Sequence, residues 1–300
     1  MQEYFFANYR LLTDDEISER ESMQYLSAFR NALPYAHTFT LRLGDSALLD
    51  AKYETALAHP IVSETTGFEI RRGPDGWSFI SKDHSAEGNK RERQVLACSR
   101  DYSDMTLYMP KDALYRESGR ERSYFLPFKT MVRVACNVGI AFHSGLSIHA
   151  SYVGKDGYGV LFVGPSGMGK STQAELWERY RGTEIVNGDG PILFEADGAW
   201  YAAGIPWDGK DQIYKQRNLP VKAVIVLEQA KENHIERLNA VQAMTVLLKL
   251  ILHPIWDNDA MDQVTALLYR CAGTVPFYHL KNLPNEDAVA LTEKTINEQG

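Results

Sequence analysis

The sequence predicts an α/β protein. Its main domain is a P-loop domain with a mixed sheet, and it has a smaller N-terminal α+β domain and helical C-terminal elements. Three observations predict this class. An apolar run over Tyr158 to Gly164 leads through a glycine-rich stretch into an amphipathic segment, which is the order strand, loop, helix. The apolar run Val221 to Gln229 is continuous, as in strands that are buried on both faces. Helical patterns then cover 240–252, 259–272 and 286–298, with a strand before the last of them.

The first 125 residues follow a different pattern, typical of a small α+β domain. Two short strand-like runs flank a Gly-Pro-Asp-Gly turn between Phe68 and Ser81, which predicts a hairpin. No catalytic motif and no internal repeat occurs in this part of the sequence. We therefore expect an N-terminal domain of unassigned role over 1–125 and a P-loop domain over 126–300, which begins with a buried helix over 128–142.

The strand that leads into the P-loop is expected to be the second arm of a hairpin. Ser147 to Val153 forms the first arm, and the residues Gly-Lys-Asp-Gly make the turn. The helix after the loop starts at Lys170 and ends before Gly182, at the position where glycine is favoured. Further strands are predicted over Thr183 to Asn187 and within the segment 191–204, which gives a mixed α/β sheet.

Composition and charge exclude several classes of protein. Hydrophobic residues make up 44% of the chain and charged residues 24%, as in globular proteins. The net charge of −7 provides no general basic field, so we expect no nucleic-acid and no membrane partner. The cysteines are few and far apart, which suits reduced thiols. The first residues lack a signal-peptide pattern, and the apolar run near Met244 to Leu252 is too short to span a bilayer, so we expect a cytoplasmic protein.

The stretch GPSGMGKS fits the pattern GxxxxGKS/T and predicts a phosphate-binding loop. Its glycines let successive N–H groups point at phosphate oxygens, and the N-terminus of the next helix adds partial positive charge. Lys170 is expected to reach the β- and γ-phosphates as a catalytic residue, and Ser171 to supply a hydroxyl to Mg²⁺ beside Thr172. The predicted nucleotide-binding residues are Gly164, Ser166, Gly167, Met168, Gly169, Lys170, Ser171 and Thr172.

A magnesium ion in such a site needs a second anchor, normally a carboxylate at the end of a neighbouring strand. Asp189 follows the first strand after the P-loop helix, and Glu228 ends a continuous apolar strand. Each has an ordinary explanation as well, because Asp is common in turns such as Asn-Gly-Asp-Gly and apolar strands often end in a charged residue. The choice depends on strand order, which the pattern does not reveal.

The segment from His149 to Leu193 resembles the HPr kinase/phosphorylase family, whose members share the phosphoenolpyruvate carboxykinase-like P-loop fold. In that family a histidine-bearing strand, a glycine-containing hairpin and an apolar strand lead into a GxSGxGKS/T loop, and the residues IHASYVGKDGYGVLFVGPSGMGKST follow this order. The family then has an Asp-Asp pair, which corresponds here to Gly188 and Asp189. The resemblance therefore favours Asp189 as the Mg²⁺ anchor beside Ser171, in a divergent member of the family.

The departures from the family pattern concern the substrate. In HPr kinase the first Asp of the pair is regarded as the general base that activates the substrate serine, and Gly188 occupies that position here. The later glycine-rich signature of the family is replaced by AGIPWDGKDQIYKQR. The resemblance thus implies the fold and phosphoryl transfer, but not HPr as the substrate.

Another group must then accept the proton of the incoming hydroxyl. The candidates are Asp189, His149 and Asp208, of which we take Asp189 and His149 as catalytic. A strand histidine hydrogen-bonded within the fold is the ordinary explanation for His149. The segment PWDGKDQIYKQR predicts either a substrate clamp or a solvated connection, and its substrate candidates are Asp208, Lys210 and Arg217.

These features predict an ATP-dependent kinase that transfers the γ-phosphoryl group, with Mg²⁺, to a hydroxyl of a small metabolite or of a protein Ser or Thr. The alternative is a nucleotide-binding regulatory module with little or no transfer, which the missing first Asp at Gly188 favours. An ATPase motor would carry a second signature such as LSGGQ, and the sequence has none. The sequence leaves open whether the chain forms a homo-oligomer.

Overall fold

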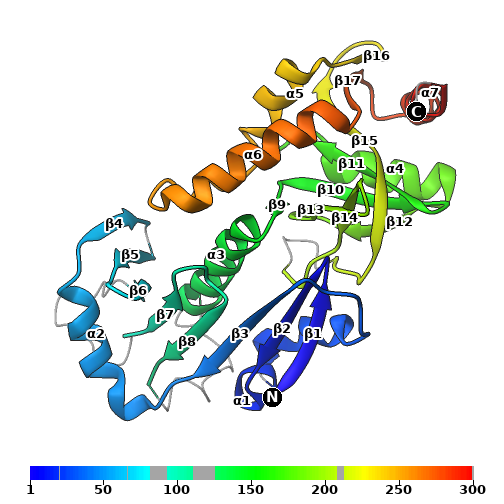
Figure 1. Ribbon diagram of the computed structural model, residues 1–300. Coiled ribbons are helices and arrows are strands. Elements are labelled where there is room, and N and C mark those ends of the chain that lie inside the picture. The colour runs from blue at the N-terminus through cyan, green and yellow to red at the C-terminus, as the bar shows by residue number, and fades with distance from the viewer. Residues whose placement is uncertain (20, 66, 82–92, 111–125, 208–212, 299–300) are drawn as a thin grey trace. The chain divides into compact units, whose positions relative to one another are not determined.

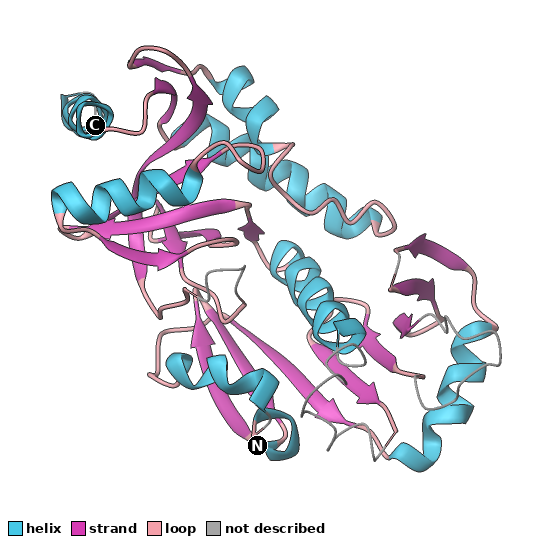
Figure 2. Ribbon diagram, turned by 180° about the vertical axis from the view of Figure 1, so that it is seen from behind, coloured by secondary structure: helices cyan, strands magenta, loops and turns pink. Residues whose placement is uncertain are grey.

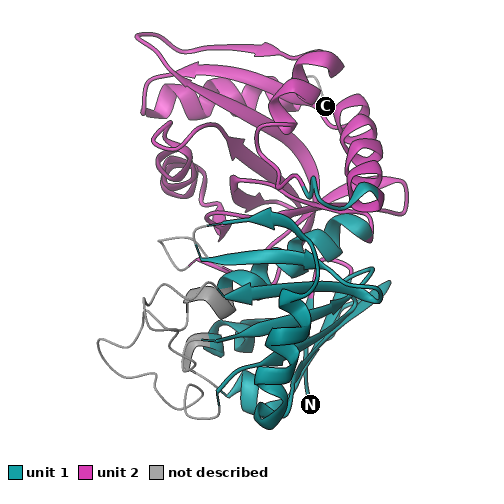
Figure 3. Cartoon of the chain, turned by 90° about the vertical axis from the view of Figure 1, so that its left-hand side faces the viewer, with its two compact units in different colours: residues 1–5, 9–142, 254–258 teal, residues 6–8, 143–253, 259–300 magenta. Residues whose placement is uncertain are grey.

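The computed structural model describes residues 1–19, 21–65, 67–81, 93–110, 126–207 and 213–298 (Figure 1). The chain forms two compact units, which Figure 3 colours separately. The first comprises Met1–Phe5, Tyr9–Phe142 and Pro254–Asn258, and the second comprises Phe6–Asn8, His143–His253 and Asp259–Gly300. Both units contain strands with helices beside them (Figure 2). No helix of the described residues is long and apolar enough to cross a bilayer.

The first unit contains a sheet of eight strands: β1 (Gln2–Phe6), β2 (Tyr9–Thr13), β3 (His37–Leu43), β4 (Ile61–Glu64), β5 (Phe68–Arg72), β6 (Gly76–Ser81), β7 (Val95–Ser99) and β8 (Asp104–Tyr108). Their order is β1-β2-β3-β8-β7-β6-β5-β4. β2, β3 and β8 are parallel, and the pairs from β8 to β4 are antiparallel. The antiparallel pairing of β5 with β6 confirms the hairpin predicted around the Gly-Pro-Asp-Gly turn.

The helical segments of the first unit are α1 (Asp15–Ser18), η1 (Glu21–Phe29), η2 (Ser46–Leu48), α2 (Leu49–Leu57) and α3 (Leu126–Phe142). α3 confirms the helix predicted over 128–142. It packs closely on the first unit, since the hydroxyl of Tyr9 donates to the carbonyl of Ile140 at 3.2 Å. A Cβ added at Gly139 would come within 2.7 Å of the Phe39 ring. The first unit therefore includes α3, whereas the boundary drawn from the sequence falls before it, after residue 125.

The second unit contains β9 (Gly145–Ser147), β10 (Ala150–Lys155), β11 (Tyr158–Val163), β12 (Glu184–Asn187), β13 (Ile192–Ala196), β14 (Ala199–Ala203), β15 (Asn218–Gln229), β16 (His234–Arg237) and β17 (Phe277–Asn282). Their order is β12-β10-β11-β15-β14-β13-β9, and β17 pairs with both β15 and β16. β11, β15 and β17 are parallel, whereas β10 is antiparallel to β11 and to β12. The prediction of an α/β protein with a mixed sheet is confirmed at this level.

The helices of the second unit are α4 (Lys170–Arg181), α5 (Ala240–Leu247), α6 (Asn258–Thr274) and α7 (Glu286–Glu298). α4 and α7 match their predicted ranges, but the helix predicted over 240–252 ends earlier, at Leu247. The reason is that the next residues pair elsewhere: the carbonyl of Leu250 accepts from the amide of His149 at 2.9 Å, and Ile251 bridges to Ile148.

The hairpin in front of the P-loop has a two-residue turn. Lys155 pairs with Tyr158, and the two residues between them have positive φ, 45° at Asp156 and 87° at Gly157. A two-residue turn with positive φ at both central positions matches the twist of the two strands that it joins. The predicted hairpin is confirmed, although its first arm starts at Ala150.

Helices α4 and α7 pack on one face of the second sheet. Trp177 of α4 is fully buried and lies 5.8 Å from Phe162 of β11, measured between ring centroids. Val289 and Ile296 of α7 belong to the same apolar cluster. Burial of these side chains holds α4, and with it the end of the P-loop, against the sheet.

A cluster of charged side chains also connects α4 and α7 with β10. Glu293 of α7 forms ion pairs with Lys155 of β10 and Arg181 of α4. Partial burial opposes ionisation of Glu293, but the hydrogen bonds from Lys155 and Arg181 outweigh it and lower the pKa of its carboxyl. We expect Glu293→Gln to lower the free energy of unfolding by about 2 kcal/mol at pH 7 in a urea titration.

The same cluster predicts a pH dependence. Because the pKa of Glu293 is lowered on folding, its stabilising effect is present above the pKa of the unfolded chain and is lost as the pH falls through the folded value. The difference between wild type and Glu293→Gln should therefore shrink in acid. A matched change at an exposed site, Glu298→Gln, should have little effect at either pH. An unchanged difference in acid would contradict this assignment.

Candidate functional site

Several strand ends of the second unit meet at one edge of its sheet. β11, β15 and β17 run parallel, so their last residues lie at the same edge. β10 runs opposite to β11, which places His149, just before β10, at this edge. β12 is antiparallel to β10 and therefore ends here as well, at Asn187. Ligands of open α/β sheets commonly bind beyond the carboxyl ends of parallel strands, and the P-loop follows β11 at this edge.

The glycine-rich loop has a backbone that only glycine adopts easily. Gly167 and Gly169 have φ of 80° and 97°, and a Cβ at either position would meet no atom within 4 Å. Backbone strain, and not crowding, is therefore what requires glycine at these positions. The amide of Met168 donates to the carbonyl of Pro165 at 3.2 Å, which tightens the turn into α4. The loop thus has the curled form that can present N–H groups to an anion.

Lys170 opens α4 and turns its side chain back over the loop. Its side chain is largely buried, and its Nζ donates to the carbonyls of Gly164 at 3.0 Å and Pro165 at 3.3 Å. Burial lowers the pKa of the Lys170 ammonium, and the negative charge of Asp189 acts in the opposite direction. Lys170 and Asp189 are therefore close enough to interact electrostatically.

His149 and Asp189 lie side by side. His149 Nδ1 is 3.1 Å from the Asp189 carboxylate oxygen Oδ1 and 3.3 Å from the backbone carbonyl of the same residue. The His149 side chain is 45% exposed and the Asp189 side chain 25%, so both can be reached from outside. The structure thus brings together the three residues predicted as catalytic, although they come from three separate segments of the chain.

A buried asparagine holds Asp189 in place, and the sequence interpretation did not single it out. The Oδ1 of Asn187 accepts hydrogen bonds from the amides of Asp189 at 3.2 Å and Gly190 at 2.8 Å. Such a side-chain turn is what Asn and Asp favour, and Asn-Gly-Asp-Gly carries the signal for it. Asp189 can therefore be both a turn residue and a functional residue, because the turn positions its carboxylate.

The predicted metal ligands are hard oxygen donors. Ser171 and Thr172 are exposed on the first turn of α4. A hydroxyl together with a carboxylate suits Mg²⁺, which takes few protein ligands and keeps water and phosphate oxygens as the others. Among the described residues, no three His, Cys, Asp or Glu side chains gather into a site made by the protein alone. Ser171 and Asp189 each supply a donor oxygen of the kind that Mg²⁺ takes.

Glu228, the other candidate anchor, has different surroundings. Its carboxylate lies 2.9 Å from His279 Nε2. Its neighbour Leu227 belongs to the apolar cluster under α4, and side chains alternate along a strand, so Glu228 points to the opposite face of the sheet.

The predicted clamp residues fall into two groups. Asp208 and Lys210 lie outside the described residues. The Nε of Arg217 is 3.6 Å from Glu184, at the first residue of β12, whereas Asp189 follows the other end of that strand. The structure does not bring Arg217 to Asp189.

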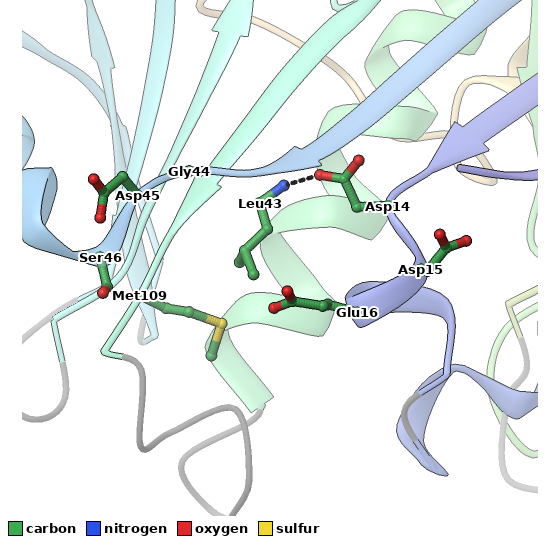
Figure 4. A pocket seen from close by; sticks show the side chains of 8 residues that line it. All are labelled: Asp14, Asp15, Glu16, Leu43, Gly44, Asp45, Ser46 and Met109. Atoms are coloured by element: carbon green, nitrogen blue, oxygen red, sulfur yellow. Dashed lines mark hydrogen bonds between the residues drawn. The ribbon is translucent and has the colours of Figure 1, made fainter.

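The first unit has a cavity of its own, of about 540 Å³ (Figure 4). Its lining residues are Asp14, Asp15, Glu16, Leu43, Gly44, Asp45, Ser46 and Met109. Four of these eight carry carboxylates, and Asp14 accepts a hydrogen bond from the amide of Leu43 at 2.7 Å. Such a lining repels phosphate, so this cavity does not suit a nucleotide.

Comparison with known proteins finds a matching family model and matching solved structures. A family model described as "SynChlorMet cassette protein ScmC" matches residues 128–281, about half of the chain. The solved structure of the Hpr(Ser) kinase/phosphatase from Coxiella burnetii matches at 14% sequence identity with a TM-score of 0.29, covering 51% of this chain and 93% of that chain. No curated protein matches.

Proposed function

This chain belongs to the SynChlorMet cassette protein ScmC family, and we propose that it is an ATP-dependent kinase that phosphorylates a hydroxyl of a small metabolite or of a protein Ser or Thr. One observation carries the proposal: Lys170, Asp189 and His149 gather beside the glycine-rich loop, at one edge of the sheet. A structural loop alone needs no carboxylate and histidine at this place. Phosphoryl transfer needs both a cation on the phosphates and a group that handles the proton.

In the proposed reaction the acceptor oxygen forms a bond to the γ-phosphorus while the bond from that phosphorus to the β,γ-bridging oxygen breaks. The proton of the hydroxyl passes to the pair formed by Asp189 and His149, whose polar atoms are 3.1 Å apart. ADP leaves with the electron pair of the broken bond. Lys170 and the loop amides hold the phosphates, and Mg²⁺, held through Ser171 and Asp189, would neutralise charge on them.

The test is incubation of the purified protein with γ-labelled ATP and Mg²⁺, against a metabolite pool and a cell extract in separate reactions. We expect label in a product of one of the two, and its loss when EDTA removes the metal. Intact ATP binding without any labelled product in either reaction would rule out the kinase and leave the regulatory module.

That second function has an observation in its favour, which is the glycine that precedes Asp189. Gly188 is not among the glycines with positive φ, so the backbone there accepts an ordinary residue. If the wild type binds ATP without transfer, Gly188→Asp should create measurable transfer by adding a second carboxylate beside Asp189. The measurement is the same labelling assay. A wild type that transfers label by itself would contradict the regulatory function.

A further inference from the structure

A second cavity lies beside the glycine-rich loop, on the side away from Asp189 and His149. Its volume is about 370 Å³. Its walls come from the loop, the first turn of α4 and the segments that follow β15 and β17, and its lining residues are Gly167, Met168, Gly169, Thr172, Gln173, Gln229, Ala230, Asn282 and Pro284. The strand order puts β12 and β10 on one side of β11 and β15 and β17 on the other. The loop therefore separates this cavity from the two proposed proton acceptors.

Two buried amide side chains in the cavity wall lack the partners that such groups normally have. Gln173 is 1% exposed, and neither its Oε1 nor its Nε2 has a hydrogen-bond partner among the described residues. Asn282 is 7% exposed; its Nδ2 donates to the carbonyl of Leu283 at 3.3 Å, while its Oδ1 is without a partner in the same part of the chain. Buried polar groups are nearly always hydrogen-bonded, and an exception at a cavity points to a ligand.

The loop is tied to this cavity by a third amide. The Nε2 of Gln229, at the end of β15, donates to the carbonyl of Gly167 at 3.1 Å. This bond connects the wall of the cavity to the backbone that would hold the phosphates. A ligand that fills the cavity and reaches the loop would therefore touch both parts at once.

We propose that this cavity binds the base of the nucleotide whose phosphates occupy the glycine-rich loop, and that Gln173 and Asn282 hydrogen-bond to the edge of the base. The inference rests on the proposed function, because it assumes that the loop holds phosphates. Each side-chain amide offers donors and an acceptor, which is the combination that base edges require. The reactive γ-phosphate then points toward Asp189 and His149, and the base toward the ends of β15 and β17.

This arrangement makes the phosphate donor a nucleoside triphosphate and distinguishes it from inorganic polyphosphate. The experiment is calorimetric titration of the full chain, with Mg²⁺, using ATP and inorganic tripolyphosphate as the two ligands. The variant is Gln173→Leu. We expect it to weaken ATP binding about tenfold and to leave tripolyphosphate binding unchanged, since it removes hydrogen bonds to the base alone.

The same variant has an unusual expected effect on stability. Because the amide of Gln173 is buried and has no hydrogen-bond partner in the part of the chain that the structure describes, its replacement by leucine should not lower the melting temperature measured without nucleotide. Gln263→Leu, at an exposed position of α6, is the matched control and should change the affinity for neither ligand. Asn282→Leu should repeat the selective loss of ATP affinity.

The outcomes separate this inference from the function on which it rests. If neither ATP nor tripolyphosphate binds the wild type, the proposed function fails and the base site fails with it. If both bind equally tightly, or if Gln173→Leu weakens both alike or neither, the loop binds phosphate but the cavity does not bind a base. Only a selective loss of ATP affinity, at an undiminished melting temperature, supports the proposal.

Discussion

Replacing Asp189 by asparagine is expected to slow phosphoryl transfer by about 10²- to 10⁴-fold and to change ATP affinity only a few-fold. Asparagine preserves the size of the side chain and can still lie beside His149, but it carries no charge and accepts no proton. The carboxylate now lies 3.1 Å from His149 and exerts its charge on Lys170. Its removal should therefore affect the step in which charge and a proton move, and much less the binding that the loop provides.

The measurement is single-turnover transfer of labelled phosphate, with ATP affinity taken from a separate titration. His149→Gln is the informative companion, because it leaves the carboxylate in place and removes the imidazole. A large loss in both variants indicates that the pair acts together, while a loss in Asp189→Asn alone means that transfer needs the carboxylate, as proton acceptor or as Mg²⁺ anchor, and does not need the imidazole. A Glu195→Gln variant, which removes an exposed carboxylate of the same unit, should leave transfer unchanged. Normal transfer by Asp189→Asn would remove the carboxylate from the mechanism.

The parts of the site that local sequence specifies could be predicted. The form of the glycine-rich loop, its strand and α4 follow from a motif within about twenty residues, because turn glycines, an apolar run and an amphipathic segment each determine nearby backbone. The hairpin before it is equally local, since Asp156 and Gly157 alone make its turn. For the same reason α7 was predicted over its full length.

The parts that depend on strand order could not be predicted from the pattern. The residue pattern left Asp189 and Glu228 as alternatives, and only the family resemblance favoured Asp189. In the structure, the placement of β12 beyond β10 brings Asp189 to the edge of the sheet where the glycine-rich loop lies. The early end of α5 has the same origin, because the segment after it pairs with residues about a hundred positions earlier in the chain. The domain position of α3 also depends on contacts with distant strands.

The cavity beside the glycine-rich loop could not be predicted, for a third reason. In the helical pattern Gln173 is an ordinary polar residue. Nothing in the neighbouring sequence indicates that its amide is buried and has no hydrogen-bond partner among the residues that the structure describes. That property depends on the ends of β15 and β17, which come more than fifty residues later. Asn187 lies between the predictable and the unpredictable cases. The turn that it forms can be predicted from the sequence, but its role in positioning Asp189 cannot.

Replacing Lys170 by alanine is expected to weaken ATP binding by at least about 100-fold and to abolish measurable transfer. The Lys170 ammonium is largely buried and donates to two loop carbonyls. Burial lowers its pKa, so a bound triphosphate, which brings negative charge to the ammonium, should be strongly favoured. The loss of this cation removes the principal side-chain partner of the phosphates.

The effect is measured best as ligand-induced stabilisation. ATP and Mg²⁺, with ATP at about 100 times the wild-type Kd, should raise the melting temperature of the wild type clearly and that of Lys170→Ala very little, because the stabilisation by a ligand grows with the logarithm of its concentration divided by Kd. Lys170→Met, which keeps the apolar stem and fills the same space, should behave like Lys170→Ala and thereby exclude a packing defect as the cause. Lys249→Ala, at an exposed site of the same unit, should respond to ATP as the wild type does. Full stabilisation of Lys170→Met by ATP would mean that the nucleotide binds elsewhere, and with it both the kinase and the base cavity would have to be abandoned.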